Sequence, residues 1–190
     1  MSELLPIGIS ARHLHLSQQD VERLFGPGHT LTPQKQLTQP GQFSCLETVA
    51  VYGPKGSFAK VRVLGPARRQ TQVEVSRSDA FILGLDPPVR DSGDLAGSPG
   101  ARLVGPAGEV ELHEGVIVAH RHLHLESSQA AKLGLKDREF IRVRVSGPRA
   151  VLFERVLVRV SPDFDMDLHL DTDEANAAGV KNGDHAELVP

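Results

Sequence analysis

Two histidines separated by one residue occur twice in this chain, in identical surroundings. Arg12-His13-Leu14-His15-Leu16 returns 109 positions later as Arg121-His122-Leu123-His124-Leu125. In an extended strand the two histidines of each copy project from one face, about 7 Å apart, while the leucines project from the other. A single His-x-His is more often a pair of hydrogen-bonded or half-exposed histidines. The duplication favours a metal-binding pair in each copy.

A second repeat supplies a further candidate ligand in each half. Val73-Glu74-Val75-Ser76 matches Leu168-His169-Leu170-Asp171 at an offset of 95 residues. Each half thus adds Glu74 or His169 to a histidine pair, and three His or carboxylate ligands without thiol are typical of a catalytic zinc. Because a carboxylate ligand donates negative charge, a zinc at Glu74 should be the weaker Lewis acid. The alternatives are a solvated strand carboxylate for Glu74 and a surface ion pair for His169.

The chain also offers a cation suited to phosphate. Arg68 follows a third matching stretch, Val61–Pro66, which resembles Val143–Pro148 at an offset of 82. A guanidinium presents a planar fork of donors to phosphate oxygens, although any single arginine is more often a surface charge. The competing candidates are Arg12, Arg69 and Arg121. We find no Gly-rich phosphate loop, no serine nucleophile elbow and no paired-cysteine motif.

Composition narrows the class of protein. The 190 residues carry a net charge of −3, only 4% are aromatic and Trp is absent, so nothing favours a nucleic-acid partner. No apolar run approaches the roughly 20 residues that span a bilayer, and residues 1–5 do not resemble a signal peptide. The single Cys45 excludes an internal disulfide. We therefore expect a cytoplasmic protein without a membrane partner.

Alternating apolar residues and turn signals indicate many short strands with helices between them. The two histidine motifs are expected at the ends of long strands, 4–16 and 115–125. Ser17 and Ser76 are expected to cap helices that end near Phe25 and Gly84. The polar stretch 30–47 is expected to form a long loop, which either contributes to ligand binding or only connects two secondary-structure elements. Other expected strands are 48–52, 58–64 and 71–75, with a hairpin over 102–112.

Taken together and in this order, the motifs resemble the PduL-type phosphotransacylases, also called phosphate propanoyltransferases. The resemblance covers essentially the whole chain. It rests on Ser10–Ser17, Gln39–Phe43, Val61–Arg68, Thr71–Ser76, Arg121–Leu125 and His169–Gly179. It implies an enzyme that interconverts acyl-CoA plus phosphate with acyl phosphate plus CoA.

The resemblance also implies a mainly β, internally duplicated fold of two β-barrel domains with short capping α-helices, and an active site with two zinc ions between them. The family exchanges its first strand, so residues 1–11 plus 120–190 would form the first β-barrel and 12–119 the second. The family's catalytic, phosphate-binding arginine falls on Arg68. Its zinc ligands fall on His13, His15, Glu74, His122, His124 and His169.

The implied substrates and products are propanoyl-CoA or acetyl-CoA, inorganic phosphate, acyl phosphate and CoA. Many members that serve bacterial microcompartments carry an N-terminal amphipathic encapsulation helix. Only five residues precede Pro6, so we expect no such helix here. A homo-oligomer, microcompartment partners and a microcompartment location stay open.

The favoured interpretation is a phosphate acyltransferase in which zinc and Arg68 hold phosphate, and a phosphate oxygen attacks the thioester directly. No residue is nominated as a covalent nucleophile, and an acyl-carrying role for Cys45 is disfavoured. Two alternatives remain. One is a two-zinc hydrolase of thioesters or phosphoesters, and the other is a non-enzymatic, zinc-stabilised β-barrel binding module.

Overall fold

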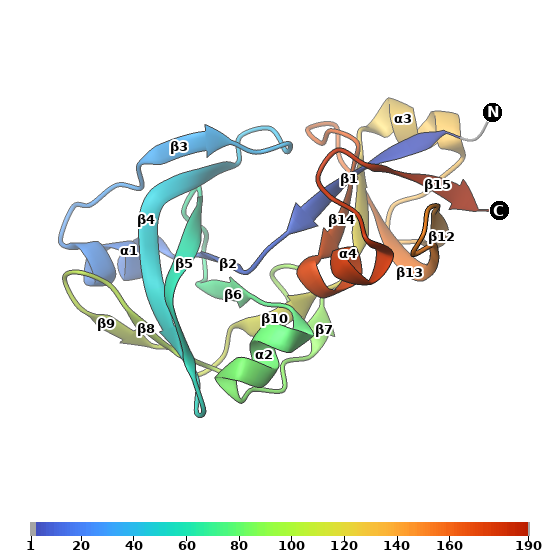
Figure 1. Ribbon diagram of the computed structural model, residues 1–190. Coiled ribbons are helices and arrows are strands. Elements are labelled where there is room, and N and C mark those ends of the chain that lie inside the picture. Colours follow the sequence, from blue (N-terminus) through green and yellow to red (C-terminus); the bar gives the residue numbers. More distant parts are fainter. Residues whose placement is uncertain (1–2, 190) are drawn as a thin grey trace. The chain divides into compact units, whose positions relative to one another are not determined.

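A computed structural model describes residues 3–189 as a mainly β fold with four short helices (Figure 1). The predicted fold class is confirmed. The helices are α1 (Gln18–Phe25), α2 (Arg77–Leu83), α3 (Ser127–Leu133) and α4 (Thr172–Ala178). The strands are β1 (Leu4–Ser10), β2 (His13–His15), β3 (Pro33–Gln36), β4 (Phe43–Tyr52), β5 (Ser57–Gly65), β6 (Gln72–Glu74), β7 (Val89–Arg90), β8 (Arg102–Val104), β9 (Glu109–Glu111), β10 (Val116–Ala119), β11 (His122–Leu125), β12 (Phe140–Val145), β13 (Val151–Val160), β14 (Asp167–Asp171) and β15 (His185–Val189). None of the helices between residues 3 and 189 is long and apolar enough to span a bilayer.

Among the described residues, unit 1 comprises 3–10, 38–40 and 120–189. Its six strands close into a barrel in the order β1-β14-β11-β13-β12-β15, with β15 pairing back to β1. The interior is filled by branched aliphatic side chains, among them Leu5, Leu123 and Leu168, each with none of its surface exposed. Residues 38–40 belong here because the Gln39 side chain exchanges hydrogen bonds with the backbone of Asp165.

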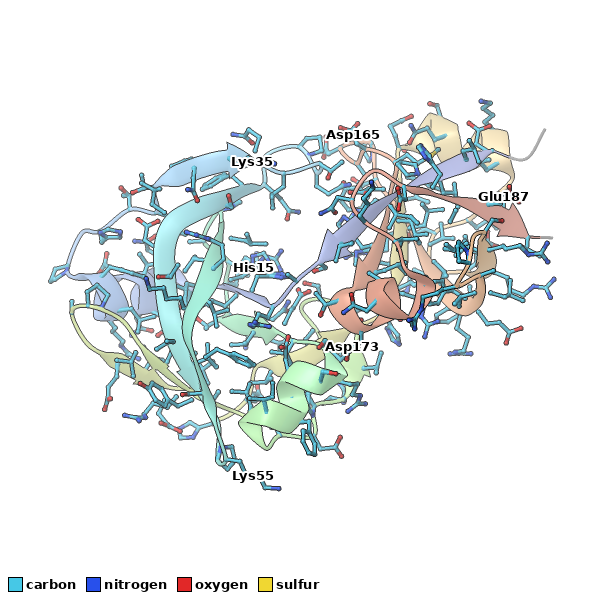
Figure 2. All side chains as sticks on the ribbon, viewed as in Figure 1. His15, Lys35, Lys55, Asp165, Asp173 and Glu187 are labelled. Carbon is cyan, nitrogen blue, oxygen red and sulfur yellow. The ribbon has the colours of Figure 1, made fainter. Side chains whose placement is uncertain are left out.

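Unit 2 comprises residues 11–37 and 41–119. Its strands form a curled, open sheet in the order β7-β10-β6-β2-β5-β4-β8-β9, and β3 pairs with β4. Its core contains Leu14, Val63 and Val73, all fully buried. Figure 2 shows His15 in the interior of this unit, while Lys55 lies at the tip of the β4–β5 hairpin.

Each histidine motif begins where the chain passes from one unit to the other. The expected strand 4–16 is wrong as a single element, because β1 pairs with β14 and β15 in unit 1 whereas β2 pairs with β5 and β6 in unit 2. The expected strand 115–125 is divided in the same way, into β10 in unit 2 and β11 in unit 1. Periodicity cannot reveal such a break, because all four segments are extended.

Strand pairing corrects one part of the predicted repeat. The offset of 82 equated β5 with β12, but β5 runs parallel to β2, and the strand parallel to β11 is β13. In these ladders Arg62 lies opposite His13 and Leu157 lies opposite His122. The true offset for this strand is therefore 95, the same as between Glu74 and His169. The Val-Arg-Val match reflected a common strand composition.

Both helices that follow the candidate third ligands are fixed by capping boxes. Ser76 caps α2 and Asp171 caps α4, and in each box the side chain three residues later returns a hydrogen bond to the cap backbone. The predicted caps at Ser17 and Ser76 are confirmed. A capping box satisfies two of the unpaired amides at a helix start, so it fixes where the strand ends and the helix begins.

The predicted loop over residues 30–47 contains β3 and the first half of β4. All four residues of β3 are exposed, so this edge strand has no apolar alternation. In β4 the polar Glu47 points inward and Leu46 points outward, which inverts the expected pattern. The buried Glu47 carboxylate accepts hydrogen bonds from the Thr32 amide and contacts His29.

Candidate metal centres

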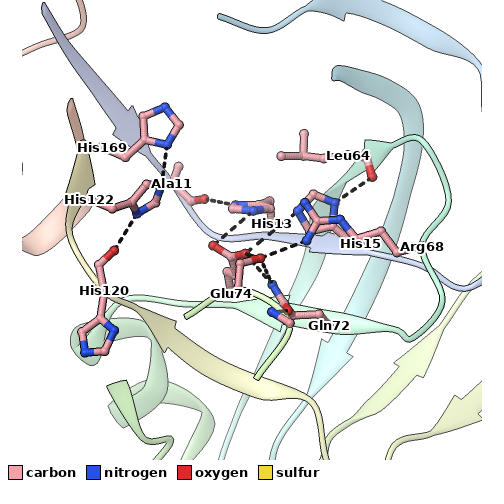
Figure 3. A network of polar contacts seen from close by, with 12 residues as sticks. Ala11, His13, His15, Leu64, Arg68, Gln72, Glu74, His120, His122 and His169 are labelled. Carbon is pink, nitrogen blue, oxygen red and sulfur yellow. Dashed lines mark hydrogen bonds and ion pairs between the residues drawn. The ribbon is translucent and has the colours of Figure 1, made fainter. Parts of the chain in front are cut away.

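The first cluster of candidate ligands, here called the Glu74 group, consists of His13, His15 and Glu74. Strands β2 and β6 are antiparallel, with His13 opposite Glu74 and His15 opposite Gln72. The Glu74 carboxylate reaches both histidines, at 3.5 Å from His13 Nε2 and 4.0 Å from His15 Nε2 (Figure 3). All three side chains are buried. The strand alternation that directs Leu14 into the core directs both histidines toward Glu74.

Hydrogen bonds to backbone carbonyls orient both imidazoles of this group. His13 Nδ1 lies 2.8 Å from the Ala11 carbonyl, and His15 Nδ1 lies 3.2 Å from the Leu64 carbonyl. A carbonyl only accepts, so Nδ1 carries a proton in each ring and Nε2 is the atom that faces the Glu74 carboxylate. This is how metal-ligating histidines are usually held.

A polar network joins the Glu74 group to Arg68. The Ser92 hydroxyl accepts from Arg68 Nη1 at 2.9 Å and donates to Glu74 Oε1 at 3.1 Å. Gln72 Nε2 donates to both Glu74 Oε1 and Ser92 Oγ. The Arg68 amide donates to the Leu16 carbonyl, so its backbone is tied to the end of the His-x-His segment. Arg68 therefore lies beside the candidate ligands.

The electrostatics of the group distinguish its two histidines. Burial, together with the charges of the neighbouring His13 and Arg68, lowers the pKa of His15 to about 3. Burial also disfavours protonated His13, but the charge and hydrogen bond of the Glu74 carboxylate outweigh it and raise the His13 pKa. His15 is therefore held neutral, the form that binds a metal.

The second cluster, here called the His169 group, consists of His122, His124 and His169. Strands β11 and β14 are antiparallel, with His122 opposite His169 and His124 opposite Asp167. The three ring centroids lie 4.7 to 4.9 Å apart. The register repeats that of the first group, with His169 in the place of Glu74 and Asp167 in the place of Gln72.

Two ring nitrogens of this group, from His122 and His169, face each other. His122 Nδ1 lies 2.7 Å from the His120 carbonyl, and His169 Nε2 lies 2.9 Å from Asp167 Oδ2. Both acceptors fix the proton on the contacted nitrogen. The remaining atoms, His122 Nε2 and His169 Nδ1, are 3.1 Å apart. Two lone pairs at this distance repel unless a cation or a proton lies between them.

His124 completes the group and is its most buried member. Its Nδ1 is buried and has no hydrogen-bond partner among residues 3–189, which is unusual for a buried polar atom. Burial lowers the His124 pKa to about 2, with contributions from His122, His169 and Arg159. The ring packs edge-on against Phe164, with centroids 4.4 Å apart.

Both groups fit a metal ion. Within each group, one ligand atom from every residue lies within 4.8 Å of the others. Tetrahedral zinc with bonds of about 2.0–2.1 Å separates its ligand atoms by about 3.3 Å. The close approach of His122 Nε2 and His169 Nδ1 is a contact that such an ion would stabilise. The donors are imidazole and carboxylate, which suits zinc with an open coordination position.

Two of the competing arginines, Arg12 and Arg121, form ion pairs with carboxylates outside the two groups. Arg12 pairs with Asp79 at 2.6 Å and stacks over Phe58. Arg121 likewise pairs with Glu174 at 2.8 Å and stacks over Phe153. In both copies the carboxylate belongs to the capping box of the helix that follows the third ligand. These arginines tie the start of each His-x-His segment to that helix.

Sequence reasoning missed three residues that contact the ligands. Gln72 and Asp167 could have been found, because each lies two positions before a third ligand at the same offset of 95. Ser92 gave no signal, since it lies in the stretch 86–100 between the predicted elements. The ring of His120 lies against Phe140, and its backbone carbonyl contacts His122 Nδ1. Cys45 is fully buried in β4.

Comparison with known proteins identifies the family. Residues 6–181 match the family model described as phosphate propanoyltransferase. The chain belongs to the phosphate propanoyltransferase family. It is 53% identical over 184 residues to a phosphate propanoyltransferase of Thermotoga maritima, a match that covers 96% of this chain and 88% of that protein.

Other relatives carry the same description. A phosphate propanoyltransferase of Rhodopseudomonas palustris is 51% identical, with 94% of this chain and 79% of the relative aligned. One of Salmonella typhimurium is 50% identical, with 94% and 85% aligned. As a member of the phosphate propanoyltransferase family, this protein is an acyltransferase, and the non-enzymatic alternative is set aside.

Proposed function

We propose that this protein is a phosphate acyltransferase that interconverts a short-chain acyl-CoA, propanoyl-CoA or acetyl-CoA, plus phosphate with acyl phosphate plus CoA, using two zinc ions. The observation that carries the proposal is the pair of thiol-free, three-ligand groups, one of which is joined to Arg68 through Ser92. Family membership supports the transfer of an acyl group to phosphate.

The two groups would hold the metals, with His13, His15 and Glu74 at one ion and His122, His124 and His169 at the other. When bound, zinc supplies positive charge that neutralises phosphate and polarises the thioester carbonyl. The repeated register would give each ion a set of three ligands, and zinc held by three protein ligands keeps its fourth position open for a substrate atom.

Arg68 is proposed as the phosphate-binding catalytic residue. Its guanidinium donates from Nη1 to Ser92, whose hydroxyl also bonds to Glu74, so the cation is oriented relative to the ligand group. A fork of N–H donors binds two phosphate oxygens and neutralises charge as the reaction proceeds. A lysine would supply the charge without the fork.

The proposed chemical step needs no covalent enzyme intermediate. A phosphate oxygen attacks the thioester carbon, an O–C bond forms and the C–S bond breaks. Hydrogen phosphate loses its proton, which ends on the departing CoA sulfur. Cys45 takes no part, since burial raises the pKa of its thiol to about 11, with a further contribution from the charge of Glu47.

A steady-state assay of CoA release from a series of acyl-CoAs, with and without phosphate, tests the activity. Release should depend on phosphate and be matched by acyl phosphate, measured as its hydroxamate. A two-zinc hydrolase would release CoA without phosphate, and added phosphate would only inhibit it. The ratio of kcat/KM values for acetyl-CoA and propanoyl-CoA measures acyl preference.

The remaining expectations concern the setting of the enzyme. A cytoplasmic location, a homo-oligomer and microcompartment partners stay predictions, which size-exclusion chromatography and cell fractionation can test.

A further inference from the structure

The third ligand of each group is contacted by the residue two positions before it. Gln72 and Asp167 occupy this position, and both are buried, with 1% and 3% of their surface exposed. Residues two apart on a strand share a face, so each side chain lies beside its ligand. Each group therefore has a pair made of the third ligand and the residue that contacts it. The pair is Glu74 with Gln72 in one group and His169 with Asp167 in the other, so both members differ.

In the Glu74 group the contacting residue is a neutral donor. The amide of Gly93 donates to Gln72 Oε1 at 2.7 Å, which fixes the orientation of the side-chain amide. The NH₂ end of Gln72 therefore faces Glu74 and Ser92. A carboxylate only accepts, so a donor without a second negative charge suits it.

In the His169 group the contacting residue is a charged acceptor. Asp167 Oδ2 accepts the Nε2 proton of His169 at 2.9 Å, which leaves Nδ1 facing His122. A neutral amide could accept this proton too, but only a carboxylate adds negative charge beside the ring. Carboxylates in this position orient metal-ligating histidines and raise their basicity.

We propose that Gln72 and Asp167 are positioning residues matched to their ligands, so that each zinc group contains one carboxylate. In the Glu74 group the carboxylate is itself a ligand. In the His169 group it is hydrogen-bonded to a candidate ligand, His169. This inference rests on the proposed zinc binding, and it makes the two ions more alike in charge than their ligands alone indicate.

The residue opposite the third ligand on the neighbouring strand also differs between the two groups. In the ladder of β1 and β14, Gly8 lies opposite His169, and in the ladder of β10 and β6, Ile117 lies opposite Glu74. A Cβ added at Gly8 would lie 2.8 Å from both carboxylate oxygens of Asp167. Asp167 thus occupies the space beside a residue that lacks a side chain. The residue pair is therefore best exchanged in the His169 group, where no side chain at Gly8 adds to the crowding around position 167.

The test is a double-mutant cycle on zinc affinity in full-length protein. Asp167→Gln, His169→Glu and the double variant are made in a Glu74→Ala background, so that only the His169 group is titrated. Zinc dissociation constants come from competition with a chromophoric chelator. Thermal unfolding of the metal-free proteins, measured in parallel, reports any structural damage.

Each single change should weaken zinc binding. Asp167→Gln removes the charged acceptor, a change that typically costs 10- to 100-fold in affinity. His169→Glu places two carboxylates side by side without a proton between them, which should cost at least as much. The double variant recreates the donor and carboxylate of the Glu74 group, so its affinity should return to within about tenfold of the background protein.

The inference would be overturned if the fold-losses of zinc affinity in the two single variants simply multiply in the double variant. Equal zinc affinity in Asp167→Gln and the background protein would overturn it too. Asp167→Glu, which keeps the charged acceptor, should bind zinc more tightly than Asp167→Gln. The proposed function fails separately, if the unsubstituted protein binds no zinc at either group.

Discussion

His122 lies directly opposite His169 on β11 and β14, with His122 Nε2 and His169 Nδ1 3.1 Å apart. The same register places His13 opposite Glu74 on β2 and β6. Each group is built within one unit, from one antiparallel pair of strands. Changes in one group should therefore leave the metal content of the other intact.

The purified protein should hold close to two zinc ions per chain. His169→Ala and Glu74→Ala should each lose about one ion, because each removes one of three ligands from one group. Elemental analysis with protein quantification measures the ratio. His120→Ala is the matched control and should retain both ions, since the contact of His120 with the group is made by its backbone carbonyl.

Loss of both ions in either single alanine variant would mean one shared site. An undiminished zinc content in His169→Ala or Glu74→Ala would remove that residue from the set of ligands.

Arg68→Ala should leave zinc content and fold intact but lower turnover by about 10²–10³-fold, the usual cost of removing one hydrogen-bond donor that stabilises a transition state. Arg68→Lys should restore activity only in part, because lysine lacks the fork. Arg69→Ala is the neighbouring control and should behave like the unsubstituted protein, since Arg69 is exposed. Near-normal kcat and phosphate KM in Arg68→Ala would identify Arg68 as a structural or surface charge.

Gly8→Ala should damage the His169 group although Gly8 has no side chain that could act as a ligand. The new methyl group would lie 2.8 Å from both Asp167 oxygens, so the carboxylate must move away from His169. We expect weaker binding of one zinc ion and a lower midpoint of thermal unfolding. Gly8→Ala combined with Asp167→Ala should recover the midpoint without recovering zinc affinity. A Gly8→Ala protein with unchanged zinc affinity would show that Asp167 does not need this space.

Cys45 should be unreactive in the native protein. Burial raises its thiol pKa to about 11, with a contribution from Glu47, so the reactive thiolate is scarce below about pH 10. Reaction with a thiol reagent at pH 8 should be slow, and it should become fast when denaturant unfolds the chain. Cys45→Ala should retain activity, at a stability cost of about 1 kcal/mol for the small cavity. Rapid alkylation that abolishes activity would reopen an acyl-carrying role.

The sequence alone predicted the residues that the structure brings together in the two candidate ligand groups. His13 and His15 share a face because side chains alternate along any strand, and this local property survives whatever the strand pairs with. The duplication then pointed to Glu74 and His169, and the helix caps at Ser17 and Ser76 were readable because capping depends on residues within one turn.

Only the tertiary structure decided the partners of these residues. The division of 4–16 into β1 and β2, the equivalence of β5 with β13, and the edge strand β3 all depend on which strands pair, and pairing joins residues far apart in the chain. Ser92 reaches Glu74 from a loop without a sequence signal. Gly8 and Asp167 meet across two strands that are more than 150 residues apart. Such contacts arise from packing, which no local pattern encodes.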